Sequence, residues 1–511
     1  STLSSSSAAS DVYKRQLVWY KVNDAASYTV ELYRDQYHTD LFMNLETTDP
    51  YVFIDDIPYG TTFYIRVRSN AARTENNSQW SYVSASTEAR PEYAKLVEDV
   101  SKTEVTESSA VIRWKKDNKQ NPVDSISIMP MMDTTLSGVS RYLTIEEMMQ
   151  GYAEVDGLTK NTLYAVNLYD TSKPRKYDKP YNQVTFRTAG PSAMSIQVGL
   201  DDDLSAMLLN NDVNPEVPEG TEYYLPAGSS YRITPFTLMK GFRLAGSRDG
   251  VKPVVVLEGS WNIAAGSYIS SLEFDNIEFR HEANNNYFMN VDKPYTIENV
   301  SFVNCDFISL RRGFWRHQSA NAKYVMNFEM EGCRFEKCGW QTSAFGMVYL
   351  KSFDDKAGVS YDQFDRAIFR NCTFSNDNDG TNGYGWGNLF YAPYMDKPIY
   401  LEYKNVTIYN YSRNQRLINI ESAVGSELIM KGILLASPCG DLFAIGANTT
   451  TTFSDNYTTA DYLLGGKNMN ATDLDITAAE LFADPVNGDL TIKDTSSPIV
   501  SSRAGDTRWL P

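Results

Sequence analysis

Histidine and cysteine are scarce in this chain of 511 residues, which contains three of the first and five of the second. The cysteines are odd in number and include no CxxC pair, so their spacing is not that of a disulfide scaffold or a zinc site. The histidines, His38, His281 and His317, are too few for a histidine-based metal cluster. We therefore interpret the cysteines as packing residues.

Basic residues are also in deficit, because 47 Lys and Arg stand against 64 Asp and Glu, which gives a net charge of -17. Nucleic-acid binding needs a basic face, so the charge argues against such a partner, and an acidic substrate would have to meet a local basic patch. No apolar run approaches the roughly 18 residues that span a bilayer, and no signal peptide is visible at the start.

Aromatic residues, by contrast, are abundant at 13% of the chain, with 34 Tyr. Tyr and Phe favour pleated, half-buried surfaces, so the class is expected to be all-β. The length predicts two to four domains or one long repeat array.

Residues 1–16 end in SSAASDVYKRQ, which resembles the in-frame translation of a sequencing-library adapter. We expect this segment not to be native and to pack against nothing. Native sequence then begins at Leu17, inside a domain whose first strand is missing. A secretion signal or lipid anchor is expected upstream of Leu17, on a protein that is extracellular or at a bacterial cell surface.

Two stretches of period-two alternation follow. The first has LVW (17–19), YTVEL (28–32) and IPYGTTFYIRV (57–67), and the second has SSAVIRW (108–114) and LTKNTLYAVNL (158–168). Both resemble the fibronectin type III pattern, with Trp19 and Trp114 on an early strand and Phe63 and Tyr164 at the later corner, where the family places Tyr. The resemblance implies β-sandwiches over 17–89, with strand A missing, and over 95–190, and such modules are usually spacers.

The rest of the chain carries an internal repeat of apolar, variable, Asn or Gly, apolar, variable and apolar positions. Its seven copies are MKGFRL (239–244), FDNIEF (274–279), FVNCDF (302–307), MEGCRF (330–335), FRNCTF (369–374), YKNVTI (403–408) and MKGILL (430–435). The inward phase slips by one residue at the Asn or Gly, so the chain must bend there for both halves to face one core. Asn and Gly tolerate the left-handed conformation that such a bend requires.

We therefore expect stacked coils about 4.8 Å apart, with bends at Gly241, Asn276, Asn304, Gly332, Asn371, Asn405 and Gly432. Inside the coils we expect a Phe stack of Phe279, Phe307, Phe335 and Phe374, and a column of free thiols from Cys305, Cys333 and Cys372.

With its entry segment GTEYYLPAGSSYRI (220–233) and closing segment AELFADPVNGDLTIKDTSSPIV (479–500), this repeat resembles the pectate lyase-like right-handed parallel β-helix superfamily. The resemblance covers 196–500 and leaves a C-terminal tail at 501–511. Together with the sandwiches and the final AGDTRW (504–509), it also resembles uncharacterised secreted surface proteins of gut bacteria. It implies a protein that degrades or binds polysaccharide. The motifs of polygalacturonases, pectin methylesterases and classical pectate lyases are missing, which disfavours a hydrolase or an esterase.

An exposed stripe is expected seven residues after the aligned positions, at Arg312, Trp340, Asp379 and Arg413. Neighbours that thicken this patch are Arg311, Trp315, Arg316, His317, Asp377, Tyr384 and Trp386. Aromatic rings stack on sugar faces, and Arg pairs with uronate carboxylates.

Three function classes remain open. The chain is a non-catalytic polysaccharide-binding surface protein, or a lyase that cleaves an acidic polymer by β-elimination, or an adhesion or scaffold rod whose patch consists of solvated loop residues. In a lyase, Arg312 or Arg316 would neutralise the uronate, His317 would be the base, and Asp377 with Asp379 would hold Ca²⁺. We expect the partner to be a polysaccharide, which the lyase alternative requires to be acidic, and other surface glycan-utilisation proteins are further candidate partners.

Overall fold

The computed structural model describes residues 15–90, 94–116, 121–282, 287–310, 312–338, 346–354, 359–375, 388–410, 416–437, 442–462 and 469–511. The chain divides into two compact units, which are described separately. The first extends to Val100 and also takes in Ala110–Leu158 and Leu163–Arg187. The second comprises Ser101–Ser109, Thr159–Thr162 and Thr188–Pro511.

The first unit contains two β-sandwich modules with the same strand order. In the first module, β1 pairs with β4 and the other sheet runs β3-β2-β5-β6. The strands are β1 (Arg15–Val18), β2 (Ser27–Tyr33), β3 (Leu41–Thr47), β4 (Tyr51–Ile54), β5 (Thr62–Asn70) and β6 (Ser81–Ser86). Strand β1 begins at Arg15 and pairs Gln16 with Phe53, so the first module includes these two residues before Leu17, contrary to the expected boundary.

The second module repeats this arrangement, with β7 paired to β10 and a sheet of order β12-β11-β8-β9. Its strands are β7 (Ala110–Arg113), β8 (Ser125–Pro130), β9 (Val139–Tyr142), β10 (Tyr152–Val155), β11 (Leu163–Tyr169) and β12 (Pro180–Arg187), and helix α1 spans Ile145–Gln150. Trp19, Trp114, Phe63 and Tyr164 are all buried at equivalent places. Both modules are therefore fibronectin type III-like sandwiches.

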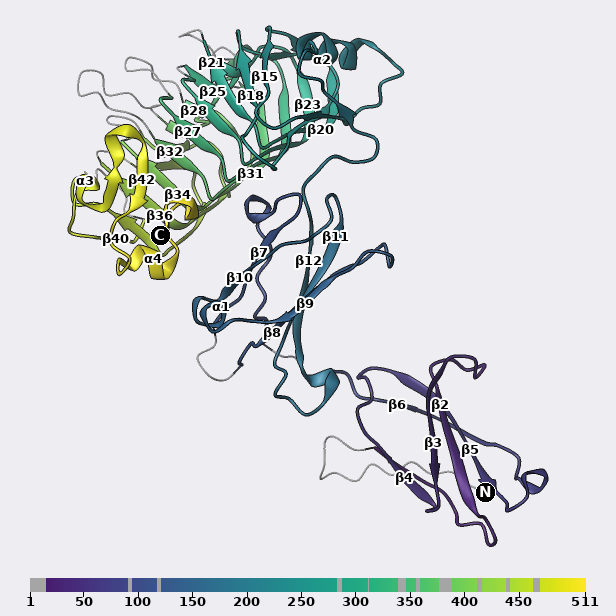
Figure 1. Ribbon diagram of the computed structural model, residues 1–511. Coiled ribbons are helices and arrows are strands. Elements are labelled where there is room, and N and C mark those ends of the chain that lie inside the picture. The colour runs from purple at the N-terminus through teal and green to yellow at the C-terminus, as the bar shows by residue number, and fades with distance from the viewer. Residues whose placement is uncertain are drawn as a thin grey trace. The chain divides into compact units, whose positions relative to one another are not determined.

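The second unit is a parallel β-helix in which each complete coil contributes three strands (Figure 1). The first ladder consists of β13 (Ile196–Gln197), β14 (Thr221–Leu225), β17 (Phe242–Gly246), β20 (Ser267–Asp275), β23 (Tyr295–Val303), β26 (Lys323–Glu331), β31 (Asp362–Arg370), β34 (Tyr400–Tyr409), β36 (Glu427–Ala436) and β38 (Thr450–Ser454). The second consists of β15 (Ser230–Ile233), β18 (Val254–Leu257), β21 (Glu278–His281), β24 (Asp306–Ile308), β27 (Arg334–Glu336), β32 (Thr373–Ser375), the ends of β34 and β36, β39 (Asn456–Thr458) and β40 (Ala471–Asp473).

The third ladder consists of β22 (Tyr287–Val291), β25 (Gly313–His317), β28 (Gly346–Leu350), β33 (Asn388–Tyr391), β35 (Ile418–Ile420) and β37 (Phe443–Ile445). Two short pairs lie outside the three ladders: β16 (Thr237–Leu238) with β19 (Asn262–Ile263), and β29 (Phe353–Asp354) with β30 (Val359–Ser360).

The first and second ladders meet at the predicted bend. Six of the seven expected bend residues have a positive φ between 49° and 65°: Asn276, Asn304, Gly332, Asn371, Asn405 and Gly432. Two neighbouring bend residues are joined directly, because the Asn304 side-chain amide donates to Asn276 Oδ1 at 2.7 Å. Two later coils continue the series with Asp455 and Asn470, at φ 55° and 54°.

Gly241 is the exception, and its place in the alignment was wrong. Strands β17 and β20 pair Leu244 with Phe274 and Ala245 with Asp275, so Gly246 is the residue beside Asn276. Gly241 is small for a different reason, because a Cβ there would lie 2.1 Å from the Ser271 carbonyl oxygen.

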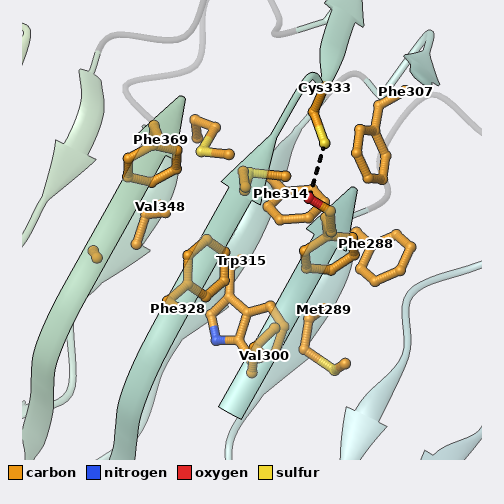
Figure 2. Close-up of a cluster of buried hydrophobic side chains, with 14 of the residues drawn as sticks. Phe288, Met289, Val300, Phe307, Phe314, Trp315, Phe328, Cys333, Val348 and Phe369 are labelled. Carbon is orange, nitrogen blue, oxygen red and sulfur yellow. Dashed lines mark hydrogen bonds between the residues drawn. The ribbon is translucent and has the colours of Figure 1, made fainter. Parts of the chain in front are cut away.

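Aromatic and sulfur-containing side chains are prominent in the core inside the coils (Figure 2). Phe279, Phe307, Phe335 and Phe374 stack in sequence, with ring centroids 5.3, 4.7 and 5.1 Å apart, as predicted. The thiol column is also confirmed, because Cys305, Cys333 and Cys372 are buried and free. The Cys333 thiol donates to the backbone carbonyl of Phe302 at 3.4 Å. A dashed line in Figure 2 marks this hydrogen bond at Cys333. Cys338 is a fourth buried free thiol.

Helices cover parts of the coil near its two ends. Helix α2 (Leu204–Val213) follows the first strand and buries Leu204 and Leu208 in the core. Near the other end lie α3 (Ala478–Leu481), the pair β41 (Phe482–Asp484) and β42 (Asp489–Ile492), and α4 (Pro498–Ser502). These pack on Tyr409, Leu434 and Ala436, beside β34 and β36 (Figure 1). In the described parts of the chain, no helix is long and apolar enough to cross a membrane.

Candidate functional site

The third ladder carries a row of polar and aromatic residues on consecutive coils. Parallel pairing places Asn290 beside Arg316, Arg316 beside Tyr349, Tyr349 beside Tyr391, and Tyr391 beside Asn419. Because these five residues are in register, their side chains leave the ladder on the same face.

That face is the outer one. The residues on both sides of each member belong to the core, for example Trp315 with His317 next to Arg316, and Val348 with Leu350 next to Tyr349. Alternation along a strand therefore directs Arg316 and Tyr349 away from the interior. We call this row, together with the adjoining Tyr287, Arg312 and Asn388, the outer strip.

One end of the outer strip is cationic. The guanidinium carbons of Arg312 and Arg316 lie 5.7 and 5.2 Å from the ring centroid of Tyr287. Gly313 leaves room for that ring, because a Cβ there would lie 2.7 Å from a ring carbon. Cation-π contact thus orients both guanidinium groups at β22 and β25.

The middle of the outer strip is aromatic and neutral. Tyr349 and Tyr391 stack with ring centroids 4.6 Å apart and planes 8° from parallel. Burial, together with the nearby Tyr349, Tyr394 and Glu421, raises the pKa of Tyr391 to about 12. Burial likewise raises the pKa of Tyr287 and Tyr349. All three phenols are therefore protonated at neutral pH and can donate hydrogen bonds.

The outer strip is partly withdrawn from solvent. Asn290, Arg316 and Tyr391 are half-buried, whereas Tyr349 and Asn419 are 8% and 7% exposed. Among the described residues, the buried amide oxygens of Asn290 and Asn388 find no hydrogen-bond partner. Charges and hydrogen bonds act more strongly at a site with reduced solvation than on an open surface.

The sequence-predicted residues divide into three groups. Arg312 and Arg316 are half-buried at the surface and belong to the outer strip. Trp315 and His317 do not, because both are 0% exposed, and the expectation that they thicken an exposed patch was wrong. Phe314 and Trp315 both point inward, so strict alternation fails at this point of β25.

The third group is Arg311, Trp340, Asp377, Asp379, Tyr384, Trp386 and Arg413, which lie outside the described residues. In sequence, they fall in the segments that lead from the second ladder to the strands of the third ladder.

His317 belongs to a buried polar network. Its Nε2 lies 2.6 Å from the Tyr295 hydroxyl and 3.2 Å from Trp315 Nε1, and its Nδ1 lies 2.6 Å from Asp362 Oδ1. Asp362 Oδ2 accepts from the Ser352 backbone N–H at 2.7 Å. This geometry fits a neutral imidazole protonated on Nδ1, and it leaves His317 no contact with a ligand at the surface.

The pair expected to hold Ca²⁺, Asp377 and Asp379, lies outside the described residues. Within the described ranges, no group of three or more His, Cys, Asp or Glu side chains could hold a metal ion.

Sequence reasoning missed the tyrosines of the outer strip, although a signal was present. The third-ladder segments YFMNV (287–291), GFWRH (313–317), GMVYL (346–350), NLFYA (388–392) and RLINI (416–420) form a second repeat. Its fourth position holds Asn290, Arg316, Tyr349, Tyr391 and Asn419. Two apolar residues precede that position and, except for His317, an apolar residue follows it, so the polar or Tyr residue between them marks the outer face.

Comparison with known proteins adds little to this picture. No family model matches the chain. No curated protein matches it. A solved two-domain fibronectin type III segment of chicken tenascin is 15% identical, with a TM-score of 0.15, and the match covers 36% of this chain and 95% of that one. The first three fibronectin domains of chicken CNTN1 are 14% identical, with a TM-score of 0.17, covering 35% and 63%. The sandwich assignment rests on the strand order described above.

Proposed function

We propose that this protein binds a polysaccharide along the outer strip of its β-helix. The observation that carries the proposal is the in-register row from Asn290 through Arg316, Tyr349 and Tyr391 to Asn419. Such a row offers a repeating set of contacts about 4.8 Å apart, which suits a linear polymer with repeating sugar units.

The chemistry of the row supports a sugar ligand. Phenol hydroxyls and amide groups donate to and accept from sugar hydroxyls, and tyrosine rings pack against the apolar faces of sugars. Tyr and Asn make such contacts with few rotatable bonds, so little conformational entropy is lost on binding.

The two arginines favour an acidic polymer. Arg312 and Arg316 are held on the Tyr287 ring, where a guanidinium fork can pair with a carboxylate or sulfate group. A local cationic end is needed because the whole chain carries a net charge of -17, which repels a polyanion elsewhere.

Binding without bond cleavage fits the geometry better than a lyase does. The base expected for β-elimination, His317, is buried and has hydrogen-bond partners at both ring nitrogens. The outer-strip tyrosines have raised pKa values and are weak proton acceptors at neutral pH.

A binding measurement across a panel of uronate, sulfated and neutral polysaccharides tests the proposal. We expect wild-type protein to bind at least one acidic polymer and Arg316→Ala to bind it roughly tenfold more weakly, in line with a charge-assisted contact. The matched control is Arg366→Ala, since Arg366 stacks on Tyr400 at 4.2 Å but lies on the first ladder.

Equal losses in the two variants, or no binding to any polymer in the panel, would contradict the proposal. Incubation of the same polymers with the protein, followed by ultraviolet absorbance for unsaturated products, decides the lyase alternative. A steady rise in absorbance would show that the protein cleaves the polymer.

A further inference from the structure

The C-terminal segment 504–509, AGDTRW, lies along the bend between the first and second ladders. Ala504 and Asp506 are 0% and 2% exposed, so this part of the C-terminal tail is packed against the coils. It ends in a short helical turn, Thr507–Trp509, in which Asp506 caps the Arg508 backbone N–H. We call residues 504–509 the strap.

The strap contacts one coil after another. The Gly505 N–H donates to the Gly432 carbonyl at 2.8 Å, and the Asp506 N–H donates to Thr407 Oγ1 at 2.9 Å. Thr373 Oγ1 donates to Asp506 Oδ2 at 2.7 Å and accepts from Trp509 Nε1 at 2.7 Å.

The far end of the strap reaches two earlier coils. Arg508 donates to the Gly332 carbonyl, and its guanidinium lies 3.7 Å from Asp306 Oδ1. A second ion pair, 2.9 Å long, joins Arg508 to Asp506 within the strap. The strap therefore touches five successive coils, at Asp306, Gly332, Thr373, Thr407 and Gly432.

These five coils also carry most of the outer strip. The chain runs from β24 to β25, from β27 to β28, from β32 to β33, from β34 to β35 and from β36 to β37, so each coil that the strap touches supplies the next strand of the third ladder. Arg316, Tyr349, Tyr391 and Asn419 all lie on coils that the strap holds.

We infer that the strap is a clasp that fixes the register and spacing of these five coils, and through them the spacing of the outer strip. The bend is where the clasp is needed, because backbone direction changes there and, within each coil, the first-ladder strand joins the second-ladder strand through a left-handed residue. Buried hydroxyls at Thr373 and Thr407 give the strap specific partners on the coil. Only the consequence for the outer strip rests on the proposed function.

Gly505→Ala is the sharpest test of the clasp in the full chain. Gly505 has a φ of 77°, and an added Cβ would lie 2.8 Å from Thr407 Oγ1. We expect the strap to detach, so that amide hydrogen exchange at the bend amides of Gly332, Asn371, Thr373 and Thr407 becomes roughly tenfold faster. Ser247, whose amide donates to the Leu225 carbonyl at 2.9 Å, should keep its rate, because both residues lie on coils that the strap does not touch.

Gly488→Ala is the matched control. Gly488 also has a left-handed φ, of 87°, but a Cβ there would meet nothing closer than 3.8 Å. This variant should leave exchange at the bend amides unchanged. The clasp is refuted if both glycine variants change the same amides, or if Gly505→Ala changes only residues after 495.

Thr373→Val keeps the test decisive if Gly505→Ala does not fold. Valine preserves the shape and removes the hydroxyl that joins Asp506 to Trp509, so bend exchange should accelerate, and Thr373→Ser should restore the original rates. Unchanged exchange in Thr373→Val would overturn the inference.

Polysaccharide affinity of Gly505→Ala is the separate, second readout. We expect it to weaken several-fold although no outer-strip residue is changed. If wild-type protein binds no polysaccharide, the proposed function fails, while the exchange data still decide the clasp. If wild type binds and Gly505→Ala binds equally well despite faster bend exchange, the link between strap and outer strip is wrong.

Discussion

His317 Nδ1 and Asp362 Oδ1 lie 2.6 Å apart inside the β-helix, and the two side chains are 0% and 3% exposed. Burial lowers the pKa of His317, and the opposing charge of Asp362 only partly offsets this effect. His281 is a second buried histidine, and burial lowers its pKa from 6.5 to about 3. Both imidazoles are therefore neutral in the folded protein at neutral pH.

The lowered pKa values predict that the β-helix is destabilised by acid. The unfolded chain binds protons at these histidines more readily than the folded one, so stability is complete above the ordinary value of 6.5 and falls as the pH drops below it. Each pH unit costs at most about 1.4 kcal/mol per histidine, down to the folded-state pKa. Urea unfolding of the β-helix between pH 7.5 and 5 measures the effect.

Single substitutions separate the contribution of these histidines to the pH dependence of stability from that of other titratable groups. His317→Gln should reduce the slope of stability against pH, whereas His38→Gln, in the first sandwich, should leave the slope for the β-helix unchanged. Buried Asp506, with a pKa that burial raises, contributes in the opposite direction, so differences between variants are more informative than the absolute slope. An identical slope in His317→Gln and wild type would contradict the prediction.

The thiol column predicts cysteines that do not react in the folded state. Burial raises the pKa of Cys305 and Cys333 well above the usual value, and a protonated, inaccessible thiol is a poor nucleophile. Cys439, the fifth cysteine, lies outside the described residues, so the test uses a Cys439→Ser background. In that variant, a thiol reagent should label no cysteine of the native protein and all four remaining cysteines after unfolding. Immediate labelling, or a disulfide between neighbours in the column, would show that the column is wrong.

The left-handed bend predicts that two substitutions of Asn304, whose φ is 50°, lower the free energy of unfolding by different amounts. Asn304→Ala should lower stability by about 1–2 kcal/mol, because a residue with a Cβ and no local hydrogen bond is strained in the left-handed region. Asn304→Gly relieves the strain and loses only the bond to Asn276 Oδ1, so its cost should be smaller. Chemical denaturation ranks the two, and the reverse order would exclude backbone strain as the reason for Asn at the bend.

The fold was predictable wherever one physical constraint recurred. The pattern of Asn or Gly followed by an apolar residue indicates the left-handed bend, and this pattern located six of the coils correctly. The first coil was misplaced because Gly241 is small for close packing and not for a positive φ. The last two bends were missed because polar residues occupy apolar positions of the repeat, at Asn456 and Thr458 after Asp455 and at Asp473 after Asn470.

The site was less predictable because it depends on the third ladder. Loops of different length precede each strand of this ladder. Counting a fixed number of residues from the bend therefore identifies Arg312 as an outer-strip residue, but it does not identify the outer-strip residues of the later coils. Phe314 and Trp315 are consecutive residues that both point inward, which strict alternation does not predict. For this reason Trp315 and His317 are buried, although the sequence predicted that they would be exposed. The stack of Tyr349 on Tyr391 depends on the pairing of β28 with β33 on the adjacent coil, which sequence spacing does not supply.

The aromatic middle of the outer strip provides the last prediction. Tyr391 is half-buried and stacks on Tyr349. Tyr391→Ala should therefore remove a stacking interaction worth about 0.5–1.5 kcal/mol and weaken polysaccharide binding roughly three- to tenfold. Tyr391→Phe keeps the ring and loses the hydroxyl, so the difference between the two variants separates stacking from hydrogen bonding. Tyr400→Ala on the first ladder is the control and should bind like wild type. Isothermal titration with the polymer identified by the panel gives the affinities, and melting curves check that each variant is folded. If Tyr391→Ala binds as tightly as Tyr400→Ala, the polymer does not lie on the outer strip, and Trp340→Ala then becomes the variant that tests the stripe expected from sequence.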